Sequence, residues 1–241
     1  MFSKELKSAL RSAKNIVCLT GAGFSAESGI PTFRGEKGLW KNYSPEELAT
    51  PQAFLQNPEL VWEWYTFRKK LILGAEPNAG HFALTELENS VEKFHLITQN
   101  VDNLHQRAGT QNVTELHGNI FKCRCFRCGK DFEEGLPLQE EIPSCTFCGD
   151  LIRPGVVWFG ESLPFNAFSD SAIFARSADF FILAGTSAVV YPAAELPIYA
   201  LNEGAFVLEI NPERTRLSTL VSESILEKSG TVLPELIKIL K

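Results

Sequence analysis

The stretch NIVCLTGAGFSA, residues 15–26, decides the fold. Its first half is an apolar run of strand length, and its second half is a Gly-x-Gly-x-x-Ala loop that leads into a helix. A strand, a glycine loop and a helix in this order open a dinucleotide-binding unit, where bare backbone and a helix N-terminus accept a pyrophosphate. A dehydrogenase carries an acidic residue about 20 positions later. Here Glu46 and Glu47 fall in a region without a core strand, so the stretch predicts a Rossmann-like fold without a standard dehydrogenase loop.

Three more apolar runs have the length of buried strands, and each ends in a polar or glycine-containing turn. They are residues 94–98 before Gln99-Asn100, 180–184 before Gly185-Thr186-Ser187, and 206–210 before Asn211-Pro212. Ligands of an open parallel sheet bind at the carboxyl ends of its strands, so these turns are expected to form the site. Helical patterns cover residues 3–14, 58–73, 78–89, 193–202 and 232–240. The prediction is an α/β fold, a Rossmann-like parallel sheet with helices on both faces.

Two segments interrupt the alternation of strands and helices. Residues 33–80 are rich in proline and aromatic residues and have helical patterns, and residues 119–152 contain five of the six cysteines. We expect both to be insertions that together form a smaller lobe, one helical and one a zinc ribbon. The Rossmann-like dinucleotide-binding domain would then consist of residues 1–32, 81–118 and 153–241.

The cysteines indicate a metal site. Two Cys-x-x-Cys pairs separated by 16 residues provide four thiolates at the spacing of a zinc ribbon. A disulfide framework is the weaker alternative, because the N-terminus has no apolar stretch of signal-peptide length. Four thiolates leave no coordination position for a catalytic water, so the zinc would be structural. Cys18 lies in an apolar strand and Cys123 is out of register with the pairs; the predicted ligands are Cys125, Cys128, Cys145 and Cys148.

Composition narrows the function further. The 241 residues are 44% hydrophobic and 22% charged, as in soluble globular proteins. No apolar run approaches the roughly 20 residues of a membrane helix, and the net charge of −6 gives no general basic field for nucleic acid. We expect a cytoplasmic protein with no membrane or specific nucleic-acid partner. The sequence does not determine the oligomeric state, although it shows no long exposed apolar stripe that would require a dimer.

Seven motifs in a fixed order carry a family resemblance. They are GAGFSAESGIPTFRG (21–35), TQNVDNLHQRAG (98–109), ELHGN (115–119), the paired Cys-x-x-Cys, PGVVWFGE (154–161), GTS (185–187) and EIN (209–211). From about residue 10 to the C-terminus the chain resembles the sirtuins, the NAD-dependent protein lysine deacylases. The resemblance implies that NAD is a reactant, that acylated lysine side chains of proteins are the substrate, and that nicotinamide, O-acyl-ADP-ribose and free lysine are the products.

The resemblance also implies roles for residues of the two central motifs. His117 matches the catalytic histidine, and an imidazole can accept a proton from a ribose hydroxyl near neutral pH. Asn100 and Asp102 match positions of the nicotinamide and ribose pocket. Taken alone, His117 would be interpreted as a structural histidine, and Asn-x-Asp could be an Asx turn or a helix cap.

The remaining cofactor contacts follow from the same match. Arg34 would contact phosphate or order the cofactor loop, although alone it could form a surface salt bridge, and Asn211 would bond the adenosine ribose. The full set comprises Gly21, Ala22, Gly23, Ser25, Glu27, Phe33, Arg34, Trp40, Gln99, Asn100, Val101, Asp102, Gly185, Thr186, Ser187, Asn211, Pro212, Glu213 and Ser229.

Two groups of residues are expected to bind the substrate. Val157, Trp158, Phe159 and Gly160 resemble the sirtuin segment that binds a peptide by main-chain pairing; Trp158 departs from the phenylalanine common in the family. Tyr65 and Arg68 are three residues apart and would share one face of a helix. The pair resembles the class III sirtuins, a bacterial and archaeal type that removes succinyl and malonyl as well as acetyl groups. The alternative is a core tyrosine with Arg68 on a solvated basic face.

Three other functions remain to be weighed. A hydride-transferring dehydrogenase shares the glycine loop but not the context of His117. A zinc-ribbon module that binds nucleic acid would need a basic face, which a net charge of −6 does not favour. ADP-ribosyl transfer to protein could use the same residues as deacylation.

Overall fold

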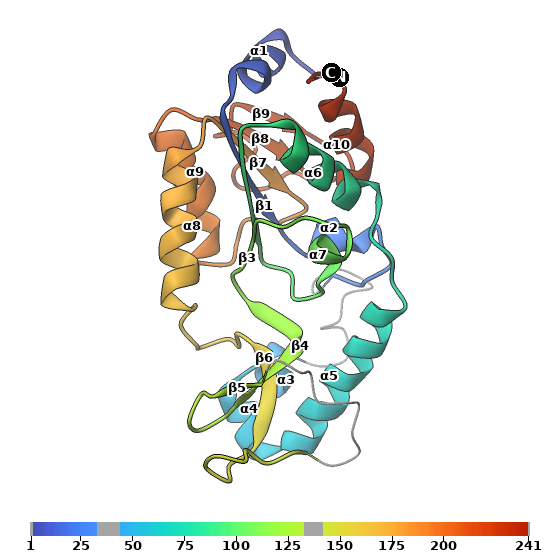
Figure 1. The fold of residues 1–241 in the computed structure, drawn as a ribbon, viewed down its shortest axis with the longest axis vertical. Helices are drawn as coiled ribbons and strands as arrows, with labels where there is room; N and C mark the ends of the chain where they lie inside the picture. Colours follow the sequence, from blue (N-terminus) through green and yellow to red (C-terminus); the bar gives the residue numbers. More distant parts are fainter. Residues whose placement is uncertain (1, 33–43, 133–141, 241) are drawn as a thin grey trace.

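The structure is a computed structural model that describes residues 2–32, 44–132 and 142–240. It has two lobes along its long axis (Figure 1), with the larger sheet in one lobe and α3, α4, α5 and a small sheet in the other. The predicted residues Phe33, Arg34 and Trp40 lie outside the described ranges. None of the helices within those ranges combines the length and apolar character that a membrane span requires.

A six-stranded parallel sheet forms the larger lobe. Its apolar strands are buried on both faces, which explains why the sequence shows contiguous rather than alternating apolar runs. The register aligns Thr20 with Thr98 on one side and with Ala184 on the other, so the carboxyl ends of the central strands meet at one edge. The strand order is β3 (Val113–Glu115), β2 (Lys93–Thr98), β1 (Asn15–Thr20), β7 (Phe180–Ala184), β8 (Phe206–Ile210) and β9 (Glu223–Ile225).

Helices cover both faces of this sheet, as predicted. In β1, Ile16 and Cys18 face one hydrophobic core, and Val17 and Leu19 face the other. The first core includes α1 (Lys4–Ser12), α6 (Ala79–Ser90) and α10 (Ser229–Ile237); the second includes α8 (Phe165–Ser177), the 3-10 turn η2 (Ala193–Glu195) and α9 (Leu196–Asn202). In Figure 1, α8 and α9 lie on one side of the sheet, and α6 and α10 lie on the other.

The last helix has other bounds than predicted, and α8 has no counterpart among the predicted helices. The last helix was predicted over residues 232–240, but α10 begins at Ser229 and ends at Ile237. Its first turn is packed against the rest of the fold: Ser229 is buried, and the backbone N–H of Gly230 donates to Glu27 Oε1. The apolar pattern predicts no helix over residues 165–177, where α8 lies, because the buried face of α8 consists of alanine and serine rather than large apolar residues.

The smaller lobe joins the two predicted insertions in one core, and this core also includes Val156 and Trp158, which were predicted to belong to the larger domain. The three-stranded antiparallel sheet runs in the order β5 (Asp131–Phe132), β4 (Gly118–Cys125) and β6 (Ile152–Val156). The helices α3 (Pro45–Leu48), α4 (Pro51–Gln56) and α5 (Pro58–Leu73) pack against it through one hydrophobic cluster. This cluster includes Phe54, Tyr65, Ile120, Val156 and Trp158.

Candidate active site

The glycine loop lies against the turn that follows β7. Gly23 donates its N–H to the Gly185 carbonyl at 2.8 Å, and a Cβ at Gly23 would lie 2.8 Å from that oxygen. Gly185 has a φ of +62°, and a Cβ there would lie 2.2 Å from the backbone nitrogen of Phe24. Only glycine fits this approach of two backbones. The short helix α2 (Ala22–Ala26) starts at the loop, so bare backbone gathers at the edge where the strands end.

A buried hydrogen-bond network connects the loop with the turn after β2. Asn100 Nδ2 donates to the Gly21 carbonyl and to Ser25 Oγ, both at 3.0 Å, and Ser25 Oγ donates to Asp102 Oδ2 at 2.7 Å. Asp102 Oδ1 also accepts the N–H of Leu104, the first residue of α7 (Leu104–Arg107). Burial raises the pKa of Asp102, and the bonds from Ser25 and Leu104 oppose that rise. The Asn-x-Asp element therefore forms an Asx turn at the start of α7 and also joins the glycine loop.

His117 lies between the two sheets, just after β3 and before β4. Its Nδ1 is 3.0 Å from the carbonyl oxygen of Gln99, which can only accept, so Nδ1 carries the proton and Nε2 has a free lone pair. Burial lowers the pKa of His117, and the bond to Gln99 opposes this effect. The result is a neutral imidazole with a fixed tautomer, which is the form that accepts a proton.

The other three histidines have structural contacts. His105 Nε2 is 2.9 Å from Thr20 Oγ1, and His81 Nδ1 accepts the N–H of Asn78 in the cap of α6. Burial lowers the pKa of His81 to about 4. His95 is stacked on Phe174. These contacts give all three histidines structural roles.

The predicted cofactor-binding residues in the turns after β7 and β8 differ in their hydrogen bonds and in their exposure. Thr186 Oγ1 accepts from Gln99 Nε2 at 3.1 Å, while Ser187 is exposed. Asn211 Nδ2 donates to the carbonyl of Glu213 at 2.7 Å, which fixes this turn at the surface together with Pro212. Gln99, Thr186 and Asn211 thus follow three strands whose carboxyl ends are aligned. Other predicted residues in this region are the partly exposed Ala22 and Val101, the Glu27 that contacts α10, and the buried Ser229.

The end of β2 also bears on the dehydrogenase alternative. β2 follows β1 in the chain among the strands of the large sheet and lies beside it. In dinucleotide-binding dehydrogenases the acidic residue that bonds the ribose follows that neighbouring strand. Here the strand ends in Thr98 and leads into Gln99. The structure therefore offers an amide where a dehydrogenase has a carboxylate.

Tyr65 and Arg68 are buried on α5, with 2% and 6% of their surfaces exposed. The Arg68 guanidinium lies 4.8 Å from the centre of the Trp64 ring. Burial lowers the pKa of Arg68, and the charge of Asp102 is among the influences that oppose it. Burial also raises the pKa of Tyr65, against the attraction of Arg68, so the phenol keeps its proton. The alternative of a solvated basic face is wrong for Arg68.

The predicted peptide-binding segment follows β6 as a loop with internal hydrogen bonds. The N–H of Val157 donates to the His117 carbonyl at 2.8 Å, and the N–H of Phe159 donates to the Ala49 carbonyl at 2.9 Å. Phe159 is half exposed and Gly160 is exposed, whereas Trp158 is buried. These bonds connect the loop with His117 and with the helical insertion.

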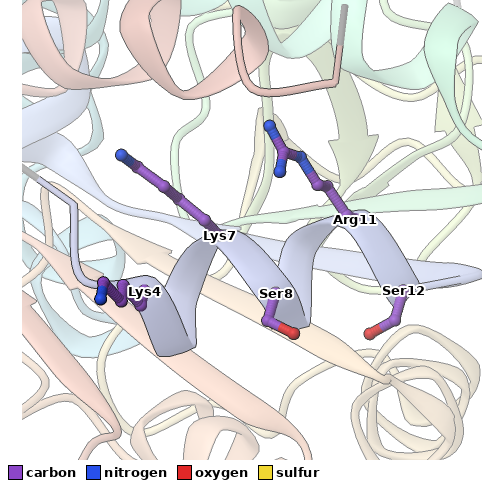
Figure 2. A pocket seen from close by; sticks show the side chains of 5 residues that line it. All are labelled: Lys4, Lys7, Ser8, Arg11 and Ser12. Atoms are coloured by element: carbon purple, nitrogen blue, oxygen red, sulfur yellow. The ribbon is translucent and has the colours of Figure 1, made fainter.

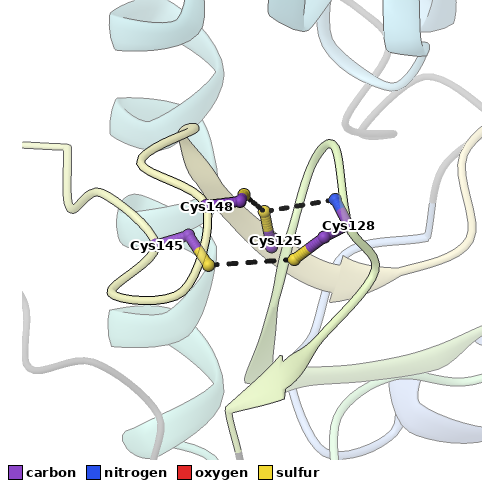
Figure 3. Close-up of side chains that lie close together, drawn as sticks. All are labelled: Cys125, Cys128, Cys145 and Cys148. Carbon is purple, nitrogen blue, oxygen red and sulfur yellow. Dashed lines mark hydrogen bonds between the residues drawn. The ribbon is translucent and has the colours of Figure 1, made fainter.

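The four predicted metal ligands come together in the smaller lobe, where Cys125 ends β4 (Figure 3). Their sulfur atoms all lie within 4.8 Å of one another, with Cys125 and Cys148 at 3.3 Å and Cys128 and Cys145 at 3.8 Å. Zn–S bonds of about 2.3 Å in a tetrahedron place sulfur atoms roughly 3.8 Å apart. The tetrad therefore fits a structural zinc ion. All six cysteines are free, so the disulfide alternative is wrong.

A surface recess elsewhere involves none of these residues. Figure 2 shows its lining side chains along α1, which lies at the opposite end of the molecule from the smaller lobe (Figure 1): Lys4, Lys7, Ser8, Arg11 and Ser12. Because one surface helix supplies the whole lining, the recess lacks the convergent groups of a binding site.

The fold and site together define an enzyme of the dinucleotide-binding class that has a structural zinc module. The chain belongs to the Sir2 family, whose family model matches residues 21–192. It is 58% identical over 218 residues to a protein of Aquifex aeolicus named NAD-dependent protein deacylase, covering 90% of this chain and 91% of that protein.

Two solved structures extend the comparison. A complex of a Sir2 homologue with NAD is 47% identical, has a TM-score of 0.93, and covers 100% of this chain and 94% of that one. A Sir2 variant with a deacetylated p53 peptide and 3′-O-acetyl-ADP-ribose is 36% identical, with a TM-score of 0.86 over 99% and 98% of the two chains.

Proposed function

We propose that this protein is an NAD-dependent protein lysine deacylase that removes acetyl, succinyl and malonyl groups from lysine side chains. Nicotinamide, O-acyl-ADP-ribose and free lysine would be the products. The observation that carries the proposal is the bond between His117 Nδ1 and the Gln99 carbonyl, beside the Asn100–Ser25–Asp102 network. It combines a proton acceptor and a polar pocket at the edge where a parallel sheet binds its ligand.

His117 would act as the general base. Its Nδ1–H is held by Gln99, so Nε2 can accept a proton from a ribose hydroxyl. The lowered pKa of His117 keeps the imidazole neutral at physiological pH. The bound NAD supplies an electrophilic ribose carbon and nicotinamide as its leaving group, and this chain's residues supply orientation and proton transfer.

Asn100 and Asp102 would orient the nicotinamide ribose and the carboxamide. The amide nitrogen of Asn100 donates twice within the protein, to Gly21 and to Ser25, which leaves Oδ1 as the group that can accept from a carboxamide. Asp102 receives the Ser25 hydroxyl and the Leu104 amide, which hold its carboxylate in place. Both side chains are buried and thus shielded from water.

Tyr65 and Arg68 would bind the carboxylate at the end of a succinyl or malonyl chain. A phenol donor and a guanidinium on one helix face match the acceptors of a carboxylate. Their burial removes competing water, which strengthens a charge-assisted hydrogen bond. An acetyl group has no carboxylate and would not need the pair.

Mass spectrometry of one peptide carrying acetyl-lysine or succinyl-lysine, with and without NAD, tests this function. We expect both groups to leave only when NAD is present, together with formation of O-acyl-ADP-ribose. Removal of acetyl alone would refute the role of Tyr65 and Arg68. If neither group leaves, the deacylase proposal is wrong, and ADP-ribosyl transfer to protein becomes the reaction to test.

A further inference from the structure

Trp158 connects the predicted peptide-binding loop with the predicted acyl pocket. Its indole Nε1 donates to Tyr65 Oη at 2.9 Å, and both side chains have only 2% of their surface exposed. An indole N–H can only donate, so the phenol oxygen must accept in this bond. The hydroxyl hydrogen of Tyr65 is then directed elsewhere, and no acceptor for it is recorded among the described residues.

The Trp158 ring is itself held in place from several sides. The Arg153 guanidinium lies 3.3 Å from the ring centroid, a cation–π contact between two buried groups. The ring of Phe54 is 5.4 Å away at a tilt of 43°. The backbone N–H of Trp158 donates to Glu161 Oε2 at 2.8 Å.

An ion pair in turn fixes Arg153. Its Nη1 is 2.5 Å from Glu161 Oε1 and its Nη2 is 3.0 Å from Oε2, a two-point contact, and Nη2 also donates to the Val156 carbonyl at 2.6 Å. Arg124 Nη2 adds a further bond of 3.0 Å to Glu161 Oε2. Two-point contacts of this kind set orientation as well as distance. Neither Arg153 nor Glu161 was a candidate site residue in the sequence.

We propose that Trp158 is a specificity-determining positioning residue that holds the Tyr65 hydroxyl as a donor toward the acyl carboxylate, with Arg153 and Glu161 keeping the indole in place. The proposal rests on the function above, because it needs the carboxylate that Tyr65 and Arg68 would bind. A phenol with no fixed donor can rotate and present either its hydrogen or its lone pairs. The Trp158 N–H fixes the phenol oxygen as an acceptor, so the phenol presents its hydrogen to the ligand. Only a ligand that accepts a hydrogen bond is bound more tightly as a result.

The test compares succinyl-lysine and acetyl-lysine in one peptide, using four proteins: the wild type, Tyr65→Phe, Trp158→Phe and the double variant. The readout is the ratio of kcat/KM for succinyl to kcat/KM for acetyl. We expect Tyr65→Phe to lower the ratio about tenfold or more, since a charged hydrogen bond is lost. Trp158→Phe should lower it about three- to tenfold, mainly through KM for the succinyl peptide. The double variant should match Tyr65→Phe alone, because the indole acts through the phenol.

Trp62 provides a matched control. Its Nε1 also donates a 2.9 Å hydrogen bond within the smaller lobe, but to the Ile152 carbonyl. Trp62→Phe therefore removes an indole N–H without affecting Tyr65, and it should leave the ratio unchanged. If Trp158→Phe does not fold, benzothienylalanine at position 158 keeps the size of the ring and replaces the N–H by sulfur, and the same comparison applies.

The possible results distinguish a failure of the Trp158 proposal from a failure of the proposed deacylase function. A wild type that removes no succinyl refutes the acyl preference and the role of Trp158 together. If Tyr65→Phe lowers the ratio but Trp158→Phe lowers both activities equally, the acyl preference stands and Trp158 is merely structural. Additive effects in the double variant would also overturn the proposal.

Discussion

Arg68→Met is the change that tests the acyl preference most directly. The variant keeps an unbranched side chain of similar length and removes the positive charge that would meet the carboxylate of a succinyl group. A hydrogen bond to a charged group is worth about 1.5–3 kcal/mol, which corresponds to roughly 10- to 150-fold in kcat/KM. Arg68 is only 6% exposed, so solvent screens little of this interaction. We therefore expect a loss in the upper part of the range for succinyl-lysine.

The acetyl substrate serves as the internal reference. Arg68→Met also removes a cation that counteracts the raised pKa of Asp102, and it removes the stacking on Trp64. Both effects act on every substrate, so they cancel in the ratio of succinyl to acetyl kcat/KM. Lys70→Met is the matched control, because Lys70 is an exposed cation on the same helix. Equal losses on both substrates, or a change of ratio in the Lys70 variant, would refute the reasoning.

Three further predictions concern the base, the metal and the backbone. The acid limb of the pH profile of kcat/KM should have its midpoint below the ordinary imidazole pKa of about 6.5, because burial lowers the pKa of His117 and only the neutral ring accepts a proton. A midpoint above that value would contradict this role. His117→Ala should lower kcat by about 10²- to 10⁴-fold. Removing zinc with a chelator should abolish hydrogen-exchange protection in β4 and β6; full activity and unchanged protection without metal would contradict a structural role. Gly185→Ala should cost more than about 3 kcal/mol in urea unfolding, because its Cβ would meet the Phe24 nitrogen at 2.2 Å. By contrast, Gly204→Ala, at φ +87° in open space, should cost only the backbone strain.

The buried parallel strands were predictable, and the peripheral elements were not. β1, β7 and β8 have the predicted bounds, and β2 begins one residue earlier, because strands buried on both faces appear in the sequence as uninterrupted apolar runs. The three-residue strands β3 and β9 are too short to show any period. In α8 the buried positions include Ser171, Ala172 and Ala175, so small residues form a packing face without a strong apolar pattern.

The site residues, like the elements of the fold, divide into those that the sequence predicts and those that it does not. His117, Asn100 and Asp102 could be proposed because they stand in short motifs at the ends of strands. The contact of Trp158 with Tyr65 joins residues 93 positions apart, and no local pattern announces such a pairing. Arg153 gave no signal either, because a buried arginine becomes understandable only when the carboxylate and the ring beside it are known.

The close contact of the glycine loop with the turn after β7 limits how this enzyme could be redesigned. A side chain at Gly21, Gly23 or Gly185 would collide with the opposite backbone or with Thr186. Most substitutions at these three positions are therefore expected to give misfolded protein. Variation aimed at accepting a different dinucleotide belongs at Ser187 and Glu213, two exposed residues of the predicted nucleotide site where new side chains have room. The rigid and the adjustable positions of the predicted nucleotide site are thus different residues, even within the turn of residues 185–187, and a designer can change the second without rebuilding the first.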